Sequence, residues 1–215
     1  MKPDPLTPPD ENTEQRILQA ARSVFVRRGT AGARMQEIAD EAGVNQALLH
    51  YYFRSKDRLS AAVFREAAGR LVPSVAALVG GEGTIEEKVE RFVHLYIDTV
   101  RHSPFLPGYV VSELHHHPER VKAMMSEAAG AQVEQIARVF VQRLDAQLKQ
   151  RAAEGTMRPI TPQQFVVSVM GLVVMPFLAR PILPILLEAE DSAFDRFLDE
   201  RRADLPGFIM SALRP

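Results

Sequence analysis

The chain has 215 residues, of which 46% are hydrophobic and 25% are charged, and its formal net charge is -1. This apolar fraction is typical of a globular protein and excludes a chain that is mainly disordered. The nearly balanced charge excludes a protein that is basic throughout, so a nucleic-acid site would have to be local. Because the sequence has no cysteine, disulfides, thiolate metal sites and cysteine nucleophiles are excluded, and we expect a cytoplasmic protein.

Two segments bear on export and membranes. Residues 1–11 hold four prolines and three acidic residues without the apolar core of a signal peptide, so we expect a flexible N-terminal arm there. The stretch Phe165–Leu187 is long enough for a membrane span. Arg180 and three prolines interrupt it. We therefore predict a buried or interface helix and no membrane partner.

Apolar residues recur with helical spacing almost throughout the chain, so we predict an all-α fold of about nine or ten helices. The first helix starts near Asn12 and ends at Gly29, and a short second helix covers Met35–Ala42. After Gly43, Asn45 is a good N-cap for a third helix with the sequence QALLHYYF. Two short helices joined by a tight turn that contains glycine are typical of a helix-turn-helix motif.

Capping residues and prolines predict the remaining helices. Their expected starting points are Ser55, Thr84, Phe105, Glu119, Thr161 and Asp191. The helix from Glu119 is predicted to run unbroken to Ala153. We divide the chain into the arm 1–11, a helix-turn-helix domain 12–54 and a larger helical domain 55–215.

The segment Arg16–Leu59 matches a family pattern at fixed spacing. The matching residues are Arg16-Ile17-Leu18, Ala20-Ala21, Phe25, Gly29, Ile38-Ala39, Ala42-Gly43-Val44, Leu49, Tyr52-Phe53, Lys56 and Leu59. On these residues the segment resembles the tetracycline-repressor (TetR) family of bacterial transcriptional regulators. One departure is Arg34, because the family usually has Thr or Ser before the second helix, where it caps that helix and touches phosphate.

The third predicted helix is the expected DNA-reading element. Leu49 should face the core, which leaves Gln46, Leu48 and Tyr51 outside. Glutamine can pair with an adenine edge and leucine can touch a thymine methyl group. The resemblance implies phosphate contacts for His50, Tyr52 and Lys56. Arg34 is a candidate for a contact with phosphate or with the minor groove. The predicted DNA-binding residues are Arg34, Asn45, Gln46, Leu48, His50, Tyr51, Tyr52 and Lys56.

Local charge supports this interpretation. Between Arg16 and Arg58 the sequence has eight basic and four acidic residues, an excess of four positive charges in a chain whose net charge is -1. Charge is therefore concentrated where phosphate binding would need it.

The resemblance also implies a homodimer on a palindromic double-stranded DNA operator, and a small-molecule effector that releases the repressor from it. The helices near 162–178 and 191–213 are the expected dimer interface, and no cofactor is expected. Methionine and aromatic side chains suit an apolar ligand of variable shape. The candidate ligand-binding residues are Phe92, Tyr96, Phe105, Tyr109, Met124, Phe140, Met170 and Met175.

Other function classes remain open at this point. His94, Asp98 and His102 share one helix face and suggest a metal-responsive regulator, although i to i+8 spans about 12 Å and one ion cannot hold both histidines. A metal-dependent helical hydrolase is disfavoured because HExxH and Gly-rich phosphate loops are missing. A helical adaptor that never binds DNA is the third class. We expect a regulator without catalytic residues.

Overall fold

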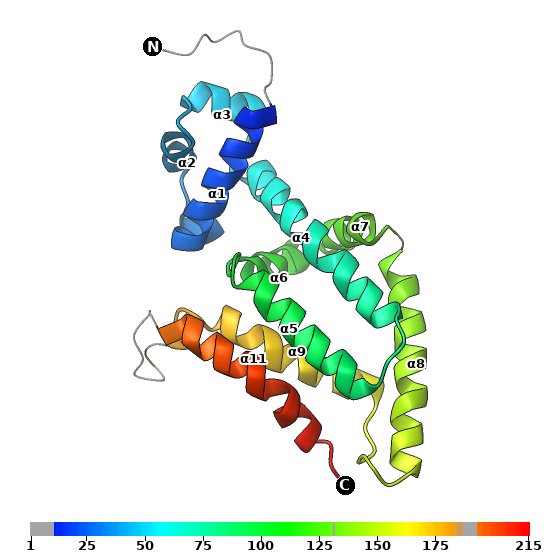
Figure 1. Cartoon of the computed structure of the whole chain (residues 1–215). Helices are drawn as coiled ribbons and strands as arrows, with labels where there is room; N and C mark the ends of the chain where they lie inside the picture. Colours follow the sequence, from blue (N-terminus) through cyan, green and yellow to red (C-terminus); the bar gives the residue numbers. More distant parts are fainter. Residues whose placement is uncertain (1–10, 131, 184, 186–192) are drawn as a thin grey trace. The chain divides into compact units, whose positions relative to one another are not determined.

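The computed structural model describes residues 11–130, 132–183, 185 and 193–215. These residues form ten α-helices, which confirms the predicted all-α class (Figure 1). The chain divides into two compact units, Met1–Ala67 and Ala68–Pro215. The division falls within one helix, α4 (Lys56–Gly80), whereas the sequence prediction put the boundary just before it. The predicted arm lies outside the described residues except for Glu11, where the first helix begins.

The first unit contains α1 (Glu11–Gly32), α2 (Met35–Ala42), α3 (Gln46–Tyr52) and the first turns of α4. α1 packs against α2, and α2 also contacts α3. The large side chains that are fully buried in this unit come from all four helices: Ile17, Val24, Phe25, Ile38, Leu49, Leu59 and Val63. The predicted inward positions of Ile38 and Leu49 are therefore confirmed.

Two glycines shape the connections of this unit. Gly43 closes α2 in the left-handed region (φ 64, ψ 34), and the N–H of Val44 donates to the carbonyl oxygen of Ala39 over 3.0 Å. This is the tight turn that the sequence predicts between the two short helices. Gly29 interrupts α1 with φ 67 and ψ 167, a backbone region that is open essentially to glycine alone.

The second unit contains the rest of α4 and the remaining helices. These are α5 (Ile85–Val100), α6 (Leu106–His116), α7 (Pro118–Ala129), α8 (Val133–Ala153), α9 (Pro162–Leu178) and α11 (Ala193–Ser211). α5 contacts both α9 and α11 (Figure 1). One apolar core joins them, with Val93 and Ile97 from α5, Val173 from α9 and Leu198 from α11.

One predicted helix is in fact two. Gly130 takes a left-handed conformation (φ 64, ψ 15) that ends α7, and α8 begins at Val133. The prediction of one helix over 119–153 was wrong because an isolated glycine in a helical pattern does not by itself show whether the helix ends. The predicted caps at Thr84 and Thr161 are confirmed by hydrogen bonds from the backbone N–H groups of Glu87 and Gln164.

No described helix is long and apolar enough to cross a membrane. Of the apolar stretch 165–187, the part up to Leu178 lies in α9, which has Pro176 in its last turn. The predicted start of the last helix, Asp191, lies outside the described residues, and α11 is described from Ala193 onward.

Candidate functional site

The third helix of the first unit is held by one apolar anchor and one cap. Leu49 is fully buried, so it fixes which side of α3 faces the core. The Oδ1 atom of Asn45 accepts a hydrogen bond of 2.7 Å from the backbone N–H of Leu48. Asn45 is thus an N-cap, as predicted, and its side-chain NH2 group is not used by this bond.

The opposite side of α3 faces solvent. Gln46 and His50 lie one turn apart and are both exposed, and Tyr51 keeps 66% of its surface accessible. Leu48 and Tyr52 are half-buried. The ring of Tyr52 meets the ring of Tyr51 edge to face, with centroids 5.7 Å apart. Ala47 is also exposed on α3, and its small side chain was not among the predicted DNA-binding residues.

Lys56 lies at the start of α4, as predicted, but its ammonium group already has protein partners. Its Nζ atom donates to the carbonyl oxygen of Ala31 over 2.9 Å and to that of Ala33 over 3.3 Å. These carbonyls end α1 and lead into α2, so Lys56 ties the connection between the two helices to α4. An ammonium has three donors, and one remains for another acceptor.

Arg34 occupies the N-cap position of α2, and its side chain makes no cap hydrogen bond. The lost cap inferred from the sequence is therefore confirmed. Arg34 is exposed, so its guanidinium group is open to solvent, and its role in DNA binding stays a prediction.

The arginines from Arg16 to Arg58 fall into two groups, those with an ion pair and those without one. Arg27 joins α1 to α2 by hydrogen bonds to both carboxylate oxygens of Glu41, which lower the pKa of that carboxyl group and raise the pKa of Arg27. Arg28 lies 3.6 Å from Glu37, and Arg22 pairs with Glu66 at 2.5 Å. Four arginines have no ion pair within the described chain: Arg16, Arg34, Arg54 and Arg58.

This unit thus combines a short exposed helix, a glycine turn and arginines that are not neutralised. Residues 17–63 match the family model described as bacterial regulatory proteins, tetR family. Residues 17–63 are therefore similar to the N-terminal region of the tetR family. The family match and the helix-turn-helix geometry cover the same residues, from α1 to the first turns of α4.

Matches to whole proteins extend the comparison beyond these residues. The chain is 31% identical to the HTH-type transcriptional regulator BetI of Rhizobium meliloti, over 61% of this chain and 60% of that protein. It is 28% identical to the HTH-type transcriptional repressor NicS of Pseudomonas putida, over 56% of this chain and 59% of the repressor. The matches therefore span about 60% of the length of these curated relatives.

The fold is shared over a longer region. The ketosteroid transcriptional regulator KstR2 of Mycobacterium tuberculosis superposes with a TM-score of 0.63, covering 96% of this chain and 97% of that structure at 14% identity. At this identity the likeness concerns the fold alone.

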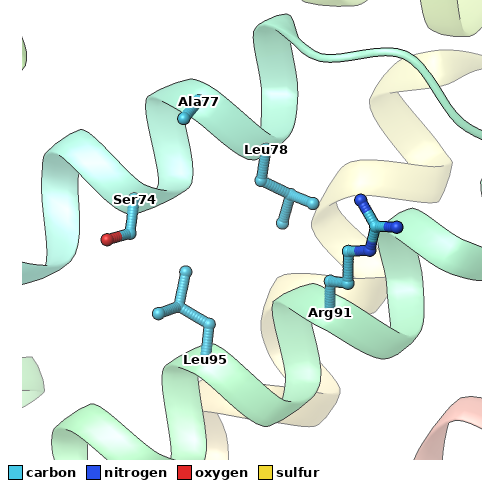
Figure 2. Close-up of a pocket in the computed structure, with 5 residues that line it drawn as sticks. All are labelled: Ser74, Ala77, Leu78, Arg91 and Leu95. Atoms are coloured by element: carbon cyan, nitrogen blue, oxygen red, sulfur yellow. The ribbon is translucent and has the colours of Figure 1, made fainter.

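The second unit has a pocket between α4 and α5. It has a volume of about 340 Å³ and is lined by Ser74, Ala77, Leu78, Arg91 and Leu95 (Figure 2). A second pocket, of about 560 Å³, lies where α8, α9 and the segment between them meet. Its lining residues include Leu148, Lys149, Arg158, Ile160 and Gln164.

None of the eight candidate ligand-binding residues lines either pocket. Tyr96 and Tyr109 are buried, Phe92, Phe105, Met124 and Phe140 are half-buried, and Met170 and Met175 are exposed. The ring of Tyr96 lies 5.8 Å from that of Phe92 and 5.9 Å from that of Phe177. This burial raises the pKa of Tyr96 above its ordinary value. These rings are packed within the core, and their ligand role stays a prediction.

Of the predicted metal-ligand candidates His94, Asp98 and His102, the last two have other contacts, and His102 lies beyond the end of α5 at Val100. Both carboxylate oxygens of Asp98 accept hydrogen bonds from the Nε atom of Arg202, at 3.0 and 3.1 Å. The Nδ1 atom of His102 donates to the backbone oxygen of Asp98 over 2.9 Å. Within the part of the chain that the structure describes, no three His, Asp or Glu side chains converge as metal ligands would.

Proposed function

We propose that this protein is a transcriptional repressor whose α3 enters the major groove of a double-stranded DNA operator. The observation that carries the proposal is the two-sided build of α3, with Leu49 fully buried and Gln46, His50 and Tyr51 turned to solvent. A recognition helix needs this division, because one side must be anchored while the other reaches base edges. The unpaired arginines nearby supply phosphate contacts, which give affinity without sequence specificity.

We propose that the repressor acts as a homodimer. An apolar surface on α9 and α11 supports this. Val167 on α9 is 70% exposed and Phe208 on α11 is 59% exposed. Met170, Met175 and Leu178 add exposed apolar surface to α9. A second copy would cover such a surface, because large contiguous apolar areas are uncommon on monomers.

The dimer is tested with the double variant Val167→Glu/Phe208→Glu. It should sediment as a monomer, because two carboxylates would be buried at the contact. Val139→Glu is the matched control, since Val139 is 40% exposed on α8, and this variant should stay dimeric. A wild-type protein that sediments as a monomer at micromolar concentration contradicts the proposed dimer.

The proposed effector binds in the second unit. It binds more tightly to the conformation of the protein that cannot bind the operator. α4 supports this, because the same helix begins in the first unit at Lys56 and lines the α4–α5 pocket at Ser74, Ala77 and Leu78. A ligand that prefers one position of α4 would thereby bias the DNA-reading units.

DNA binding itself is tested by the salt dependence of binding to mixed genomic duplexes. Wild-type affinity should fall steeply with salt, because bound arginines release counterions from the phosphates. The Arg54→Gln/Arg58→Gln variant should bind more weakly and with a shallower slope, whereas Arg138→Gln, an exposed arginine on α8, should behave like wild type. A helical adaptor that does not use DNA would show no such slope. Once an operator sequence is known, a reporter gene placed behind it distinguishes a repressor, which lowers expression, from an activator, which raises it.

A further inference from the structure

The α4–α5 pocket combines an apolar wall with one cationic group. Leu78 of α4 and Leu95 of α5 supply the apolar side chains, and Arg91 lies one turn before Leu95 on the same helix. Figure 2 shows the side chain of Arg91 extending from α5 toward Leu78. The volume of about 340 Å³ is at the lower end of the range of small-molecule sites.

The positive charge of Arg91 is not neutralised by the groups around it. Within the described residues Arg91 has no ion pair. Glu87, one turn earlier on α5, is the acidic residue best placed to face it. However, the Oε2 atom of Glu87 accepts a hydrogen bond of 3.0 Å from the backbone N–H of Thr84 as part of a capping box.

Ser74, the other polar residue that lines the pocket, already donates its hydroxyl proton in a hydrogen bond. The hydroxyl of Ser74 donates to the carbonyl oxygen of Arg70 over 3.2 Å. Arg91 is therefore the lining side chain with free donors. A guanidinium group presents five N–H donors in a planar fork that matches a carboxylate.

We propose that this pocket takes a small amphipathic anion, with its carboxylate at Arg91 and its apolar body between Leu78 and Leu95. The inference rests on the proposed effector function and names the chemical class of the effector. Arg91 is exposed, so a neutral compound of the same shape would leave its donors to water and gain no ion pair, and a cationic one would be repelled. The site should therefore discriminate by charge among molecules with equal apolar bodies.

The test is calorimetric titration of the DNA-free protein with three probes of one chain length: octanoate, octan-1-ol and octylamine. Octanoate should bind at least fivefold more tightly than octan-1-ol, and octylamine should bind most weakly. Arg91→Leu should weaken octanoate binding by about fivefold, the upper end for an ion pair at an exposed side chain. Arg138→Gln is the matched control and should not change it.

A second variant tests the pocket without changing its charge. Ala77→Phe should fill the space and weaken the binding of octanoate and octan-1-ol alike, while unfolding cooperatively like wild type. Equal octanoate affinity in wild type and Arg91→Leu, or equal affinity for octanoate and octan-1-ol, would overturn the inference. Wild-type protein that binds DNA but not octanoate also overturns the inference, and the proposed DNA-binding function stands. Octanoate binding without any DNA binding would instead refute the proposed DNA-binding function.

Discussion

The ammonium group of Lys56 in α4 donates a hydrogen bond of 2.9 Å to the carbonyl oxygen of Ala31 at the end of α1. With its second bond, to Ala33, it fixes the connection that leads into α2. A residue expected from the sequence to contact phosphate is thus also a support for the helix-turn-helix motif.

Replacing Lys56 by methionine should therefore have two separate effects. Loss of the bonds to the carbonyls should lower the free energy of unfolding by about 1 kcal/mol. Loss of one phosphate contact in each protomer of the proposed dimer should reduce the slope of log affinity against log salt by about 1.8. Urea unfolding and DNA titration at several salt concentrations measure the two effects, and Arg138→Gln should show neither. An unchanged slope would mean that Lys56 supports the motif without touching DNA.

Asn45 and Gln46 are neighbours for which we predict opposite phenotypes. Asn45→Ala removes the cap on Leu48 and should cost about 1 kcal/mol of stability. Gln46 is exposed, so Gln46→Ala should leave stability unchanged and relax base preference at one operator position by about 1–3 kcal/mol. Denaturant unfolding and competition with single-base operator variants measure these effects. A Gln46→Ala variant that discriminates bases as well as wild type would remove Gln46 from the readout.

Gly29 should be sensitive to the addition of a single methyl group. A Cβ atom there would meet no other atom within 4 Å, so any cost comes from the backbone conformation alone (φ 67, ψ 167). Gly29→Ala should destabilise the protein by about 1–3 kcal/mol. Gly32→Ala is the control, since its nearest contact would be an ordinary 3.7 Å to the Cβ of Arg28. Equal unfolding midpoints for the two variants would contradict the assigned strain.

Tyr96 makes stability depend on alkaline pH. Burial raises its pKa in the folded state above the ordinary value of 10.0, so the folded protein holds the phenolic proton more tightly than the unfolded chain does. The resulting stabilisation is complete below pH 10.0 and is lost as pH rises through the folded-state pKa. Tyr96→Phe should therefore lose less stability than wild type between pH 9 and 11, as measured by urea unfolding. Parallel losses in the two proteins would contradict this assignment.

Local signals made much of the fold predictable. The inward position of Leu49 follows from helical spacing, and the caps at Asn45, Thr84 and Thr161 involve residues only three apart. Such features depend on short stretches of sequence, so no tertiary contact is needed to infer them.

Features that depend on distant residues were not predictable in this way. The hydrogen bond from Lys56 to Ala31 joins residues 25 apart. The α4–α5 pocket requires that Leu78 and Leu95 of two helices face one space. The predicted ligand-binding residues are methionines and aromatic residues such as Tyr96, which packs within the core, and none of them lines this pocket. Whether Gly130 would end a helix was likewise not decided by its neighbours in sequence.

The most direct test of the central claim is selection of bound duplexes from a random library at about 150 mM salt, near physiological ionic strength. The protein is first unfolded and refolded to remove any bound small molecule. We predict a palindromic site whose half-site centres lie about 34–36 Å apart, or somewhat more. The Gln46→Ala variant should select a site that is relaxed at one matching position in each half. If refolded, dimeric wild-type protein enriches no sequence, α3 is not a DNA-reading helix and the account is wrong.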